Sequence, residues 1–516
     1  MPTGAAVAHY TCTDMCDGIA QGTDGMDYSL PSRDLIASAV EMHANSGYYD
    51  AVVLVSGCDK AVPAHLMAAA RLDLPTMHIP GGSMPSGRND VTVDLIGTLA
   101  ARMRRGEISR EEYGAWVRDA APSCGSYAFM GTALTSQVLS EVLGFALPHT
   151  AVAPSVGEFI DSTAHRAGVT LLERLKKKIT ARSLITPGSL RNAMVVHAAT
   201  GGSTNFVIHL AAIAAEAGME LDLDELQHIN DTTPYLVDIR PAGRFPANLF
   251  WHAGGVPRIM RELKSRLDLD CISGTNRSWG DELESLEANG YFTEPDQELT
   301  RRNLAWTDII HTDDAPMQSQ GAIAILRGNL APEGSVVKRT AVEASARQLI
   351  GSALVFEDQE TALDAITDRV VRPGHVVVIR NEGPRGSGMP EQYYVTSAIA
   401  ADAELVSSVA LVTDGRFSGA SLGPCVGHVS PESAVGGPIG LILTGDIIEV
   451  DITHCWLNLL GDATTDAADL SAAMGDALLA VRAANPPMRP PASTDGYLGL
   501  YRHLAQSAMA GARLAV

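Results

Sequence analysis

Residues 51–71 read Ala51-Val-Val-Leu-Val55, then Ser56-Gly-Cys-Asp-Lys60, then Ala61-Val-Pro-Ala-His-Leu-Met-Ala-Ala-Ala-Arg71. The first run is short, apolar and rich in β-branched residues, which predicts a buried strand. The last run has a proline in its first turn and predicts a helix. A thiol, a carboxylate and an ammonium therefore stand at a strand-to-helix turn, where open α/β sheets bind ligands. Taken alone, residues 56–60 favour a plainer interpretation, a buried cysteine beside a surface Asp–Lys pair.

The composition describes a globular protein. Of the 516 residues, 46% are hydrophobic and 19% are charged, which is enough apolar material for roughly two to four domains. The formal net charge of −22 and the 5% aromatic content argue against a nucleic-acid partner, because such partners require basic or aromatic surfaces. No apolar run reaches the length of a transmembrane helix, and residues 1–10 lack the basic start of a secretion signal. We therefore expect a cytoplasmic protein with no membrane partner.

The pattern along the chain changes in its second half. From residue 28 to 118, helical patterns alternate with short apolar runs, and the composition shifts after about residue 270. Residues 271–320 are polar and predict a connection between domains. Beyond them, short apolar runs separated by Gly, Pro and Asp predict a β-sandwich or barrel. The predicted strands span residues 322–326, 335–337, 353–356, 375–380, 409–412, 439–443 and 446–452.

Two further features are rich in candidate chemistry. Gly201-Gly-Ser-Thr-Asn205 precedes an apolar helical pattern, so it predicts either an anion site at a helix N-terminus or a plain helix cap. The seven cysteines form no CxxC pair, and in a large cytoplasmic chain such cysteines are buried thiols, nucleophiles or metal ligands more often than disulfides.

Four segments taken together are far more specific than any one of them. They are Cys16-Asp-Gly-Ile-Ala-Gln-Gly22 with Tyr28-Ser-Leu-Pro-Ser-Arg33, then Cys58-Asp-Lys60, then Gly201-Gly-Ser-Thr-Asn205, and finally Leu411-Val-Thr-Asp-Gly-Arg-Phe-Ser-Gly419 with Gly427-His-Val-Ser-Pro-Glu432 and Gly436-Gly-Pro-Ile-Gly440. The pattern resembles the dihydroxy-acid and sugar-acid dehydratases, a family that includes dihydroxy-acid, 6-phosphogluconate, arabinonate and xylonate dehydratases. The resemblance covers residues 11–455, with the motifs in family order.

Further stretches resemble the xylonate dehydratase branch of that family. They are Thr135-Ser-Gln137, Ala146-Leu-Pro-His149, His197-Ala-Ala199, Gly328-Asn-Leu-Ala-Pro-Glu-Gly-Ser335 and Cys425-Val-Gly-His-Val-Ser-Pro-Glu432. The resemblance implies an N-terminal α/β domain and a C-terminal β-barrel-like, swivelling domain with the site between them. We place the α/β domain at residues 1–315, the β-rich domain at 316–485 and a helical tail at 486–516.

The resemblance implies a magnesium site and a serine base. By position, Asp17, Asp59 and Glu391 would bind Mg²⁺ through carboxylate oxygens. Lys60 would join them if carbamylated, since an ammonium cannot ligate a cation; its plainer role is a charge partner of Asp59. Ser418 matches the catalytic serine that removes the proton from C2 of the substrate, with a turn serine as the alternative. Expected substrate contacts come from Ser203, Thr204, Asn205 and Arg416.

The resemblance also implies an iron–sulfur cluster, [2Fe–2S] or [4Fe–4S], held by three cysteines. Cys58 matches one of them. The first belongs to an upstream segment that this chain does not contain, so we expect that an N-terminal segment is missing. Tyr127 stands where the third is expected, and Cys124, three residues earlier, could replace it only if the loop is shifted. Cys12 and Cys16 are interpreted as buried thiols.

These observations predict a hydro-lyase that converts a sugar acid, most simply a pentonate such as xylonate, to a 2-keto-3-deoxy acid. One alternative is a dihydroxy-acid dehydratase of branched-chain amino-acid synthesis. Because two cluster cysteines are not in place, a second alternative is a cluster-deficient, non-catalytic homologue that binds sugar acids. Family resemblance implies a homodimer or a homotetramer.

Overall fold

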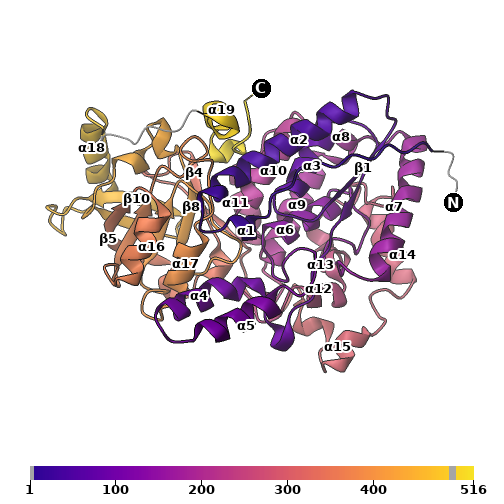
Figure 1. The fold of residues 1–516 in the computed structure, drawn as a ribbon, viewed down its shortest axis with the longest axis horizontal. Helices are drawn as coiled ribbons and strands as arrows, with labels where there is room; N and C mark the ends of the chain where they lie inside the picture. Colours follow the sequence, from indigo (N-terminus) through magenta and orange to yellow (C-terminus); the bar gives the residue numbers. More distant parts are fainter. Residues whose placement is uncertain (1–4, 487–494, 516) are drawn as a thin grey trace.

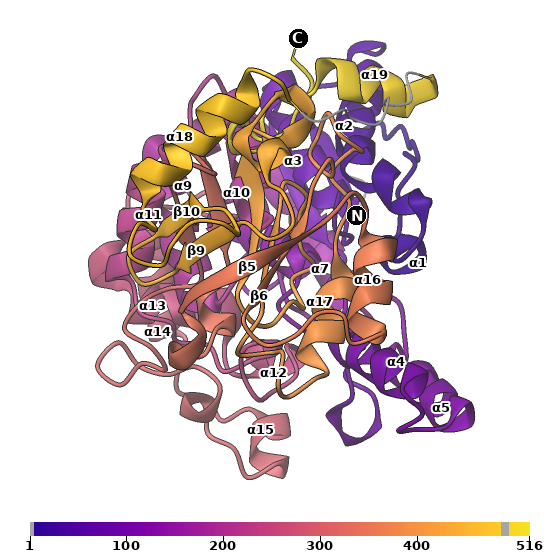
Figure 2. The same ribbon diagram turned by 90° about the vertical axis from the view of Figure 1, so that its left-hand side faces the viewer.

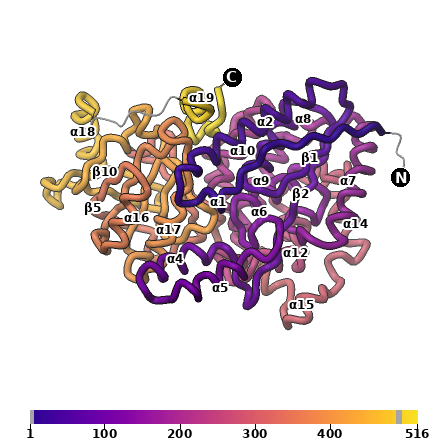
Figure 3. Tube along the Cα trace, in the orientation of Figure 1, coloured from indigo at the N-terminus to yellow at the C-terminus, as the bar shows by residue number. Residues whose placement is uncertain are grey.

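In the computed structural model, which describes residues 5–486 and 495–515, the chain forms a helix-rich part and a β-rich part that lie side by side (Figure 1). The helix-rich part is built by the first three-fifths of the chain. The β-rich part follows it in the sequence and is seen face on after a quarter turn (Figure 2). The N-terminal segment runs across the helices to the boundary between the two parts (Figure 3).

The stretch at residues 51–71 folds as predicted. β1 (Val52–Ser56) pairs in parallel with β2 (Thr76–Pro80), and α3 (Ala61–Leu72) connects them. α3 ends at Asp73, whose backbone is left-handed. Ten consecutive residues of α3 are buried, because α2 (Ser29–Asn45) and α10 (Phe206–Glu216) pack against it. In the described residues this sheet has only two strands, so helices rather than strands dominate the first part.

Long helices complete the core of the first part. α9 (Pro187–Thr200) begins at a capping box made by Thr186 and Ser189 and ends at Gly201, whose φ of 69° is left-handed. α6 (Thr132–Val142) packs against α9 and α3. The remaining helices of this part with at least eight residues are α4 (Ile96–Arg104), α5 (Arg110–Ala120), α7 (Glu158–Lys177), α11 (Leu223–Thr232), α13 (Gly255–Glu262) and α14 (Trp279–Ala288).

Residues 271–320 were predicted to connect two domains, and that prediction is wrong because the segment is part of the helical core. It contains α14 and the short helix α15 (Gln297–Arg301), and the side chains of Trp279, Phe292 and Leu299 are buried in the same core as α9 and α10. The segment reads as polar because each short helix buries only one or two apolar residues per turn, and these are large.

The second part contains an eight-stranded mixed sheet in the order β10-β9-β5-β6-β7-β8-β4-β3. The strands are β3 (Ala324–Leu326), β4 (Gly334–Val337), β5 (Gln348–Phe356), β6 (His375–Ile379), β7 (Ala410–Thr413), β8 (Cys425–Ser430), β9 (Ile447–Asp451) and β10 (Trp456–Gly461). Arg327, directly after β3, forms a bridge to Trp456 of β10, so the two ends of the order meet and the sheet is nearly closed. The mixed α/β class and the barrel-like second part are confirmed; the swivelling motion stays a prediction.

One predicted strand is not a strand. Residues 438–441 form the 3-10 helix η9 (Pro438–Leu441), because Pro438 occupies its first turn and lacks the N–H that a sheet ladder needs. Two strands, β8 and β10, were not predicted. Helices α16 (Gln359–Thr367), α17 (Tyr393–Ala400) and α18 (Ala472–Ala483) pack on the sheet or its flanks.

The end of the chain returns to the helical part. After α19 (Gly496–Leu504), the buried Arg33 of α2 donates to the carbonyl oxygens of Gly511 and Ala512 at 2.9 and 3.0 Å. Residues 487–494 of the predicted tail lie outside the described residues. The predicted boundaries after residues 315 and 485 stay predictions. Within the described residues, no helix is both long and apolar enough to cross a membrane.

Candidate metal and catalytic site

Three carboxylates from distant parts of the sequence meet at the boundary between the two parts. Asp17 begins α1 (Asp17–Ala20), Asp59 lies in the turn between β1 and α3, and Glu391 precedes α17. One oxygen from each lies within 4.8 Å of the others. The structure therefore brings together the three carboxylates that the sequence motifs selected. Carboxylate oxygens at this spacing suit a hard divalent cation such as Mg²⁺.

Two buried cations balance this carboxylate triad. Lys60 Nζ lies 2.8 Å from Asp17 Oδ2 and also donates to Asp59. Arg416 donates through Nη1 to Glu391, and its Nη2 lies 3.5 Å from Asp17 Oδ2. Both cationic side chains are fully buried. Lys60 thus occupies, as an ammonium, the charge-partner role that was the plainer interpretation of the sequence, and it serves Asp17 as well as Asp59.

The balance of burial and charge differs among the carboxylates. Burial opposes the ionisation of Asp17, yet Lys60 and Arg416 together hold the pKa of Asp17 below its usual range. Burial dominates at Asp59, where it raises the pKa to about 7 despite the nearby Lys60 ammonium. Asp59 therefore holds a proton more readily than Asp17 does.

Neutral side chains orient the triad. Ser29 Oγ donates to Asp17 Oδ1 at 2.8 Å. Gln21 Nε2 and Asn205 Nδ2 donate to the two oxygens of Glu391 at 2.7 and 2.9 Å. Ser29 and Gln21 belong to the motif between residues 16 and 33, which was the only sequence signal that pointed to them.

The Gly201–Asn205 turn makes hydrogen bonds within the fold. The Ser203 N–H donates to Thr135 Oγ1, and the Asn205 N–H donates to Ser203 Oγ. Ser203 and Thr204 are buried, and neither lines the cavity described below. Their predicted contact with substrate stays a prediction, although the N–H groups of Ser203 and Asn205 already donate within the fold. Asn205 acts on the site through Glu391.

Arg416 is bonded within the protein, and its predicted contact with substrate stays a prediction. Its Nε donates to the Met389 carbonyl at 2.7 Å, and Nη2 donates to Ser29 Oγ at 2.7 Å. With its other bonds to Glu391 and Asp17, the guanidinium is committed within the protein and does not line the cavity.

A cavity of about 130 Å³ opens beside the triad. Ser418, in the loop after β7, lines it together with all three carboxylates. The Ala420 N–H donates to Ser418 Oγ at 3.3 Å. Most of the remaining wall is apolar or aromatic, with Val93, Ile96, Phe129, Leu134, Tyr393 and Tyr394.

Behind Ser418 lies a lysine that the sequence did not single out. Lys338 is almost entirely buried, and its Nζ donates to the carbonyl oxygen of Gly419 at 3.1 Å. Burial lowers the pKa of Lys338 to about 7, an effect that the nearby Asp94 carboxylate opposes. The amine of Lys338 is therefore held at the carbonyl of the residue that follows Ser418.

The thiols depart from the predicted cluster set. Cys58 hydrogen-bonds to Cys16, and Cys16 Sγ lies 3.7 Å from the Tyr127 hydroxyl. That hydrogen bond lowers the pKa of Cys16 to about 5 and raises that of Cys58. Cys124 is exposed, so its predicted role as a cluster ligand is unsupported. Cys16, which was interpreted as a buried thiol, is only partly buried. Among the described residues, no third thiol joins Cys16 and Cys58, so a three-cysteine cluster does not fit.

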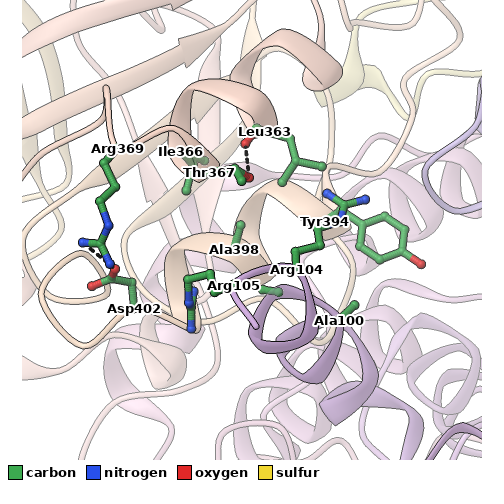
Figure 4. A pocket seen from close by; sticks show the side chains of 12 residues that line it. Ala100, Arg104, Arg105, Leu363, Ile366, Thr367, Arg369, Tyr394, Ala398 and Asp402 are labelled. Carbon is green, nitrogen blue, oxygen red and sulfur yellow. Dashed lines mark hydrogen bonds and ion pairs between the residues drawn. The ribbon is translucent and has the colours of Figure 1, made fainter. Parts of the chain in front are cut away.

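Two other hollows contain none of the predicted site residues. One lies between α4, α16 and α17, where Arg369 lies next to Asp402 and Arg104 lies next to Tyr394 (Figure 4). Arg369 and Asp402 form a loose ion pair there at 4.0 Å. The other, of about 390 Å³, lies between residues 8–14, α2 and β1.

Comparison with known proteins gives consistent matches. The N-terminal model of the dihydroxy-acid/6-phosphogluconate dehydratases matches residues 2–282, and the C-terminal model matches residues 308–512. A dihydroxy-acid dehydratase from Methanothrix thermoacetophila is 42% identical over 462 residues, covering 89% of this chain and 81% of that protein. The dihydroxy-acid dehydratase of Acetivibrio thermocellus is 38% identical over 517 residues, covering 99% of this chain and 88% of that protein.

Proposed function

Since the chain belongs to the dihydroxy-acid/6-phosphogluconate dehydratase family and is a hydro-lyase, we propose that it removes water from a short 2,3-dihydroxy carboxylate to give a 2-keto acid. The observation that carries this proposal is that Ser418 and the carboxylate triad line one small cavity. The proton on C2 of such a substrate is weakly acidic, so its removal requires both a base and a bound cation close to C2.

The residues of the triad fit Mg²⁺. Asp17, Asp59 and Glu391 supply hard oxygen donors at compatible spacing, and the ion would supply charge stabilisation for the enolate-like state of the substrate. The hydrogen bonds from Gln21, Ser29 and Asn205 hold these oxygens in place.

Ser418 takes the proton from C2 in this proposal, while the hydroxyl group leaves C3 and the resulting enol becomes the ketone. A serine hydroxyl is a weak base, so its alkoxide needs nearby positive charge. Lys338 supplies such charge through the peptide of Gly419, and it also fixes the loop that carries Ser418. Lys338 is thus a positioning residue.

The wall of the cavity favours a substrate with an alkyl side chain. A pentonate has two more hydroxyl groups beyond C3, and each would need a polar partner in the cavity. The hydroxyl of Tyr393 already accepts a hydrogen bond from the N–H of Gly97. Five wall residues have apolar side chains, namely Val93, Ile96, Phe129, Ala133 and Leu134, beside the polar side chains of Gln21, Asp94, Tyr127, Thr132 and Tyr394. The curated relatives with 38–42% identity carry the name dihydroxy-acid dehydratase, which agrees with this preference.

The sugar-acid prediction rests on stretches that lie away from the cavity. Gln137 accepts a hydrogen bond from the Gly82 N–H, His149 is held by Tyr291, and His197 contacts the Ser203 carbonyl. None of these residues lines the cavity, so their likeness to xylonate dehydratases reflects scaffold rather than substrate contacts. Xylonate specificity, the cytoplasmic location and the homodimer or homotetramer stay predictions.

The test is a 2-keto-acid assay on protein purified without oxygen and supplied with Mg²⁺. We expect turnover of 2,3-dihydroxyisovalerate, little with xylonate, and none in Ser418→Ala, whose smaller side chain leaves the fold intact. Turnover of xylonate alone would establish the sugar-acid alternative. If neither acid is converted while Mg²⁺ binds, the assignment of a working dehydratase site is wrong.

A further inference from the structure

Two Cys-Asp dipeptides lie side by side at the boundary of the two parts. Asp17 and Asp59 belong to the carboxylate triad, and each directly follows a cysteine. The preceding residues, Cys16 and Cys58, are hydrogen-bonded to one another. The backbone thus places a pair of soft donors beside a set of hard ones. The hydrogen bond between the two thiols makes them candidates for binding a single ion.

A phenol and a carbonyl extend this thiol pair. The Tyr127 hydroxyl lies 3.7 Å from Cys16 Sγ, and the Met15 carbonyl oxygen lies 3.7 Å from Cys58 Sγ. Tyr127 packs so closely on Gly18 that a Cβ at residue 18 would lie 1.9 Å from the phenol oxygen. Tyr127 is therefore held over the thiol pair, and any side chain at residue 18 would displace it.

This donor set suits one ion better than a cluster. Two thiolates select a thiophilic metal such as Zn²⁺ or Fe²⁺, and oxygen donors or water can complete a tetrahedral site around it. A cluster with three cysteines would need sulfur where Tyr127 supplies oxygen. Cys124, the nearest cysteine in the sequence, is exposed.

The electrostatic surroundings also favour a cation. The carboxylates of Asp14, Asp17 and Asp59 all act on Cys58, and they would attract a divalent ion. Cys16 and Cys58 are partly exposed, and Tyr127 lines the cavity, so an ion can enter from solvent. Lys60 and Arg416 are engaged with the carboxylate triad.

We propose that Cys16, Cys58 and Tyr127 bind one thiophilic divalent cation, next to the carboxylate triad and separate from it. This thiol site does not depend on which dihydroxy acid is the substrate. It differs from the family's three-cysteine cluster in both its ligands and the number of metal ions.

The test uses Co²⁺ as an optical probe on the full chain, reduced, stripped with a chelator and kept without oxygen. Excess Mg²⁺ fills the carboxylate triad. We expect one Co²⁺ per chain and a sulfur-to-cobalt charge-transfer absorption, which carboxylates cannot produce. The absorption should vanish in Cys16→Ser and in Cys58→Ser, and it should persist in the matched control Cys124→Ser. In Tyr127→Phe we expect affinity to fall about tenfold, as for loss of one ligand contact.

A second measurement does not depend on the folding of the variants. Saturating Zn²⁺ should protect Cys16 and Cys58 of the unaltered chain from alkylation, read by mass spectrometry, while exposed Cys124 reacts at its former rate. Absence of the charge-transfer absorption, or equal alkylation with and without Zn²⁺, would overturn the proposal. Recovery of acid-labile sulfide with two or more irons per chain after reconstitution would replace the single ion with a cluster.

Discussion

Lys60 must change its charge if the carboxylate triad is to bind a divalent cation. The ammonium lies 2.8 Å from Asp17 Oδ2, so an ion on that oxygen would sit close to it. At about 4 Å and an effective dielectric constant of about 20, the repulsion between a divalent ion and an ammonium is about 8 kcal/mol. Deprotonation of the lysine costs less than this repulsion, because removing the proton at pH 7 from an ordinary lysine with a pKa of about 10.4 requires about 5 kcal/mol. The acidic neighbours raise the pKa of Lys60, which adds to that cost.

The sequence motif offers a way around this cost, since carbamylation by CO₂ turns the lysine into an anionic oxygen ligand. We therefore expect the affinity for Mn²⁺, an optical and magnetic substitute for Mg²⁺, to be of the order of a thousandfold weaker in CO₂-free buffer than in bicarbonate, close to the deprotonation cost above. Without CO₂, each bound ion should release one proton, so affinity should rise with pH about tenfold per unit below the pKa of Lys60.

The assay is Mn²⁺ titration by electron paramagnetic resonance with and without bicarbonate. Lys60→Met should bind Mn²⁺ in CO₂-free buffer. Its affinity should not respond to bicarbonate and should lack the rise with pH that deprotonation of Lys60 causes. Lys264→Met, at an exposed position, is the matched control and should behave like the unaltered chain. If the unaltered chain binds Mn²⁺ equally well in both buffers and at every pH from about 6 to 9, a range below the ordinary lysine pKa, Lys60 is not coupled to the metal and the reasoning is wrong.

Three further outcomes follow from the same contacts. Asn205→Ala removes the donor to Glu391, and we expect Mn²⁺ affinity to fall about tenfold. Because Asn205 is buried and also donates to Thr132, stability in urea should fall by about 1–3 kcal/mol. Equal affinity would show that Asn205 does not orient the triad. Burial lowers the pKa of Lys338 to about 7, so above that pH the unfolded chain binds more protons than the folded chain, and this residue makes the free energy of unfolding rise between about pH 7 and 10. In urea unfolding, Lys338→Met should show a rise that is smaller by about 4 kcal/mol over that range. An identical rise in both proteins would contradict the buried titration. Arg33→Met should cost about 3–5 kcal/mol and expose the tail around residues 511–512 to protease, whereas an unaltered protease pattern would mean that Arg33 does not anchor the tail.

Local patterns predicted local structure well and failed where structure depends on distant partners. The apolar run at residues 52–56 and the alanine-rich helix after it need no outside information, because strand and helix periodicities are visible within a few residues. β8, by contrast, contains a glycine and a histidine and becomes a strand only between β7 and β4. Its six residues are all buried, so the alternation that marks a half-exposed strand is absent.

The sequence by itself determined the strand–turn–helix at residues 51–71 and the β-rich character of the second part, and the family resemblance selected Asp17, Asp59 and Glu391. Only the tertiary structure decided the partners: Lys60 shared between two carboxylates, Cys16 set against Cys58, and Ser203 turned into the fold. The physical reason is the separation along the chain between the residues that interact. Backbone periodicity is written within a few neighbouring residues, whereas charge pairing and donor geometry across hundreds of residues exist only once the helices and the barrel have packed together.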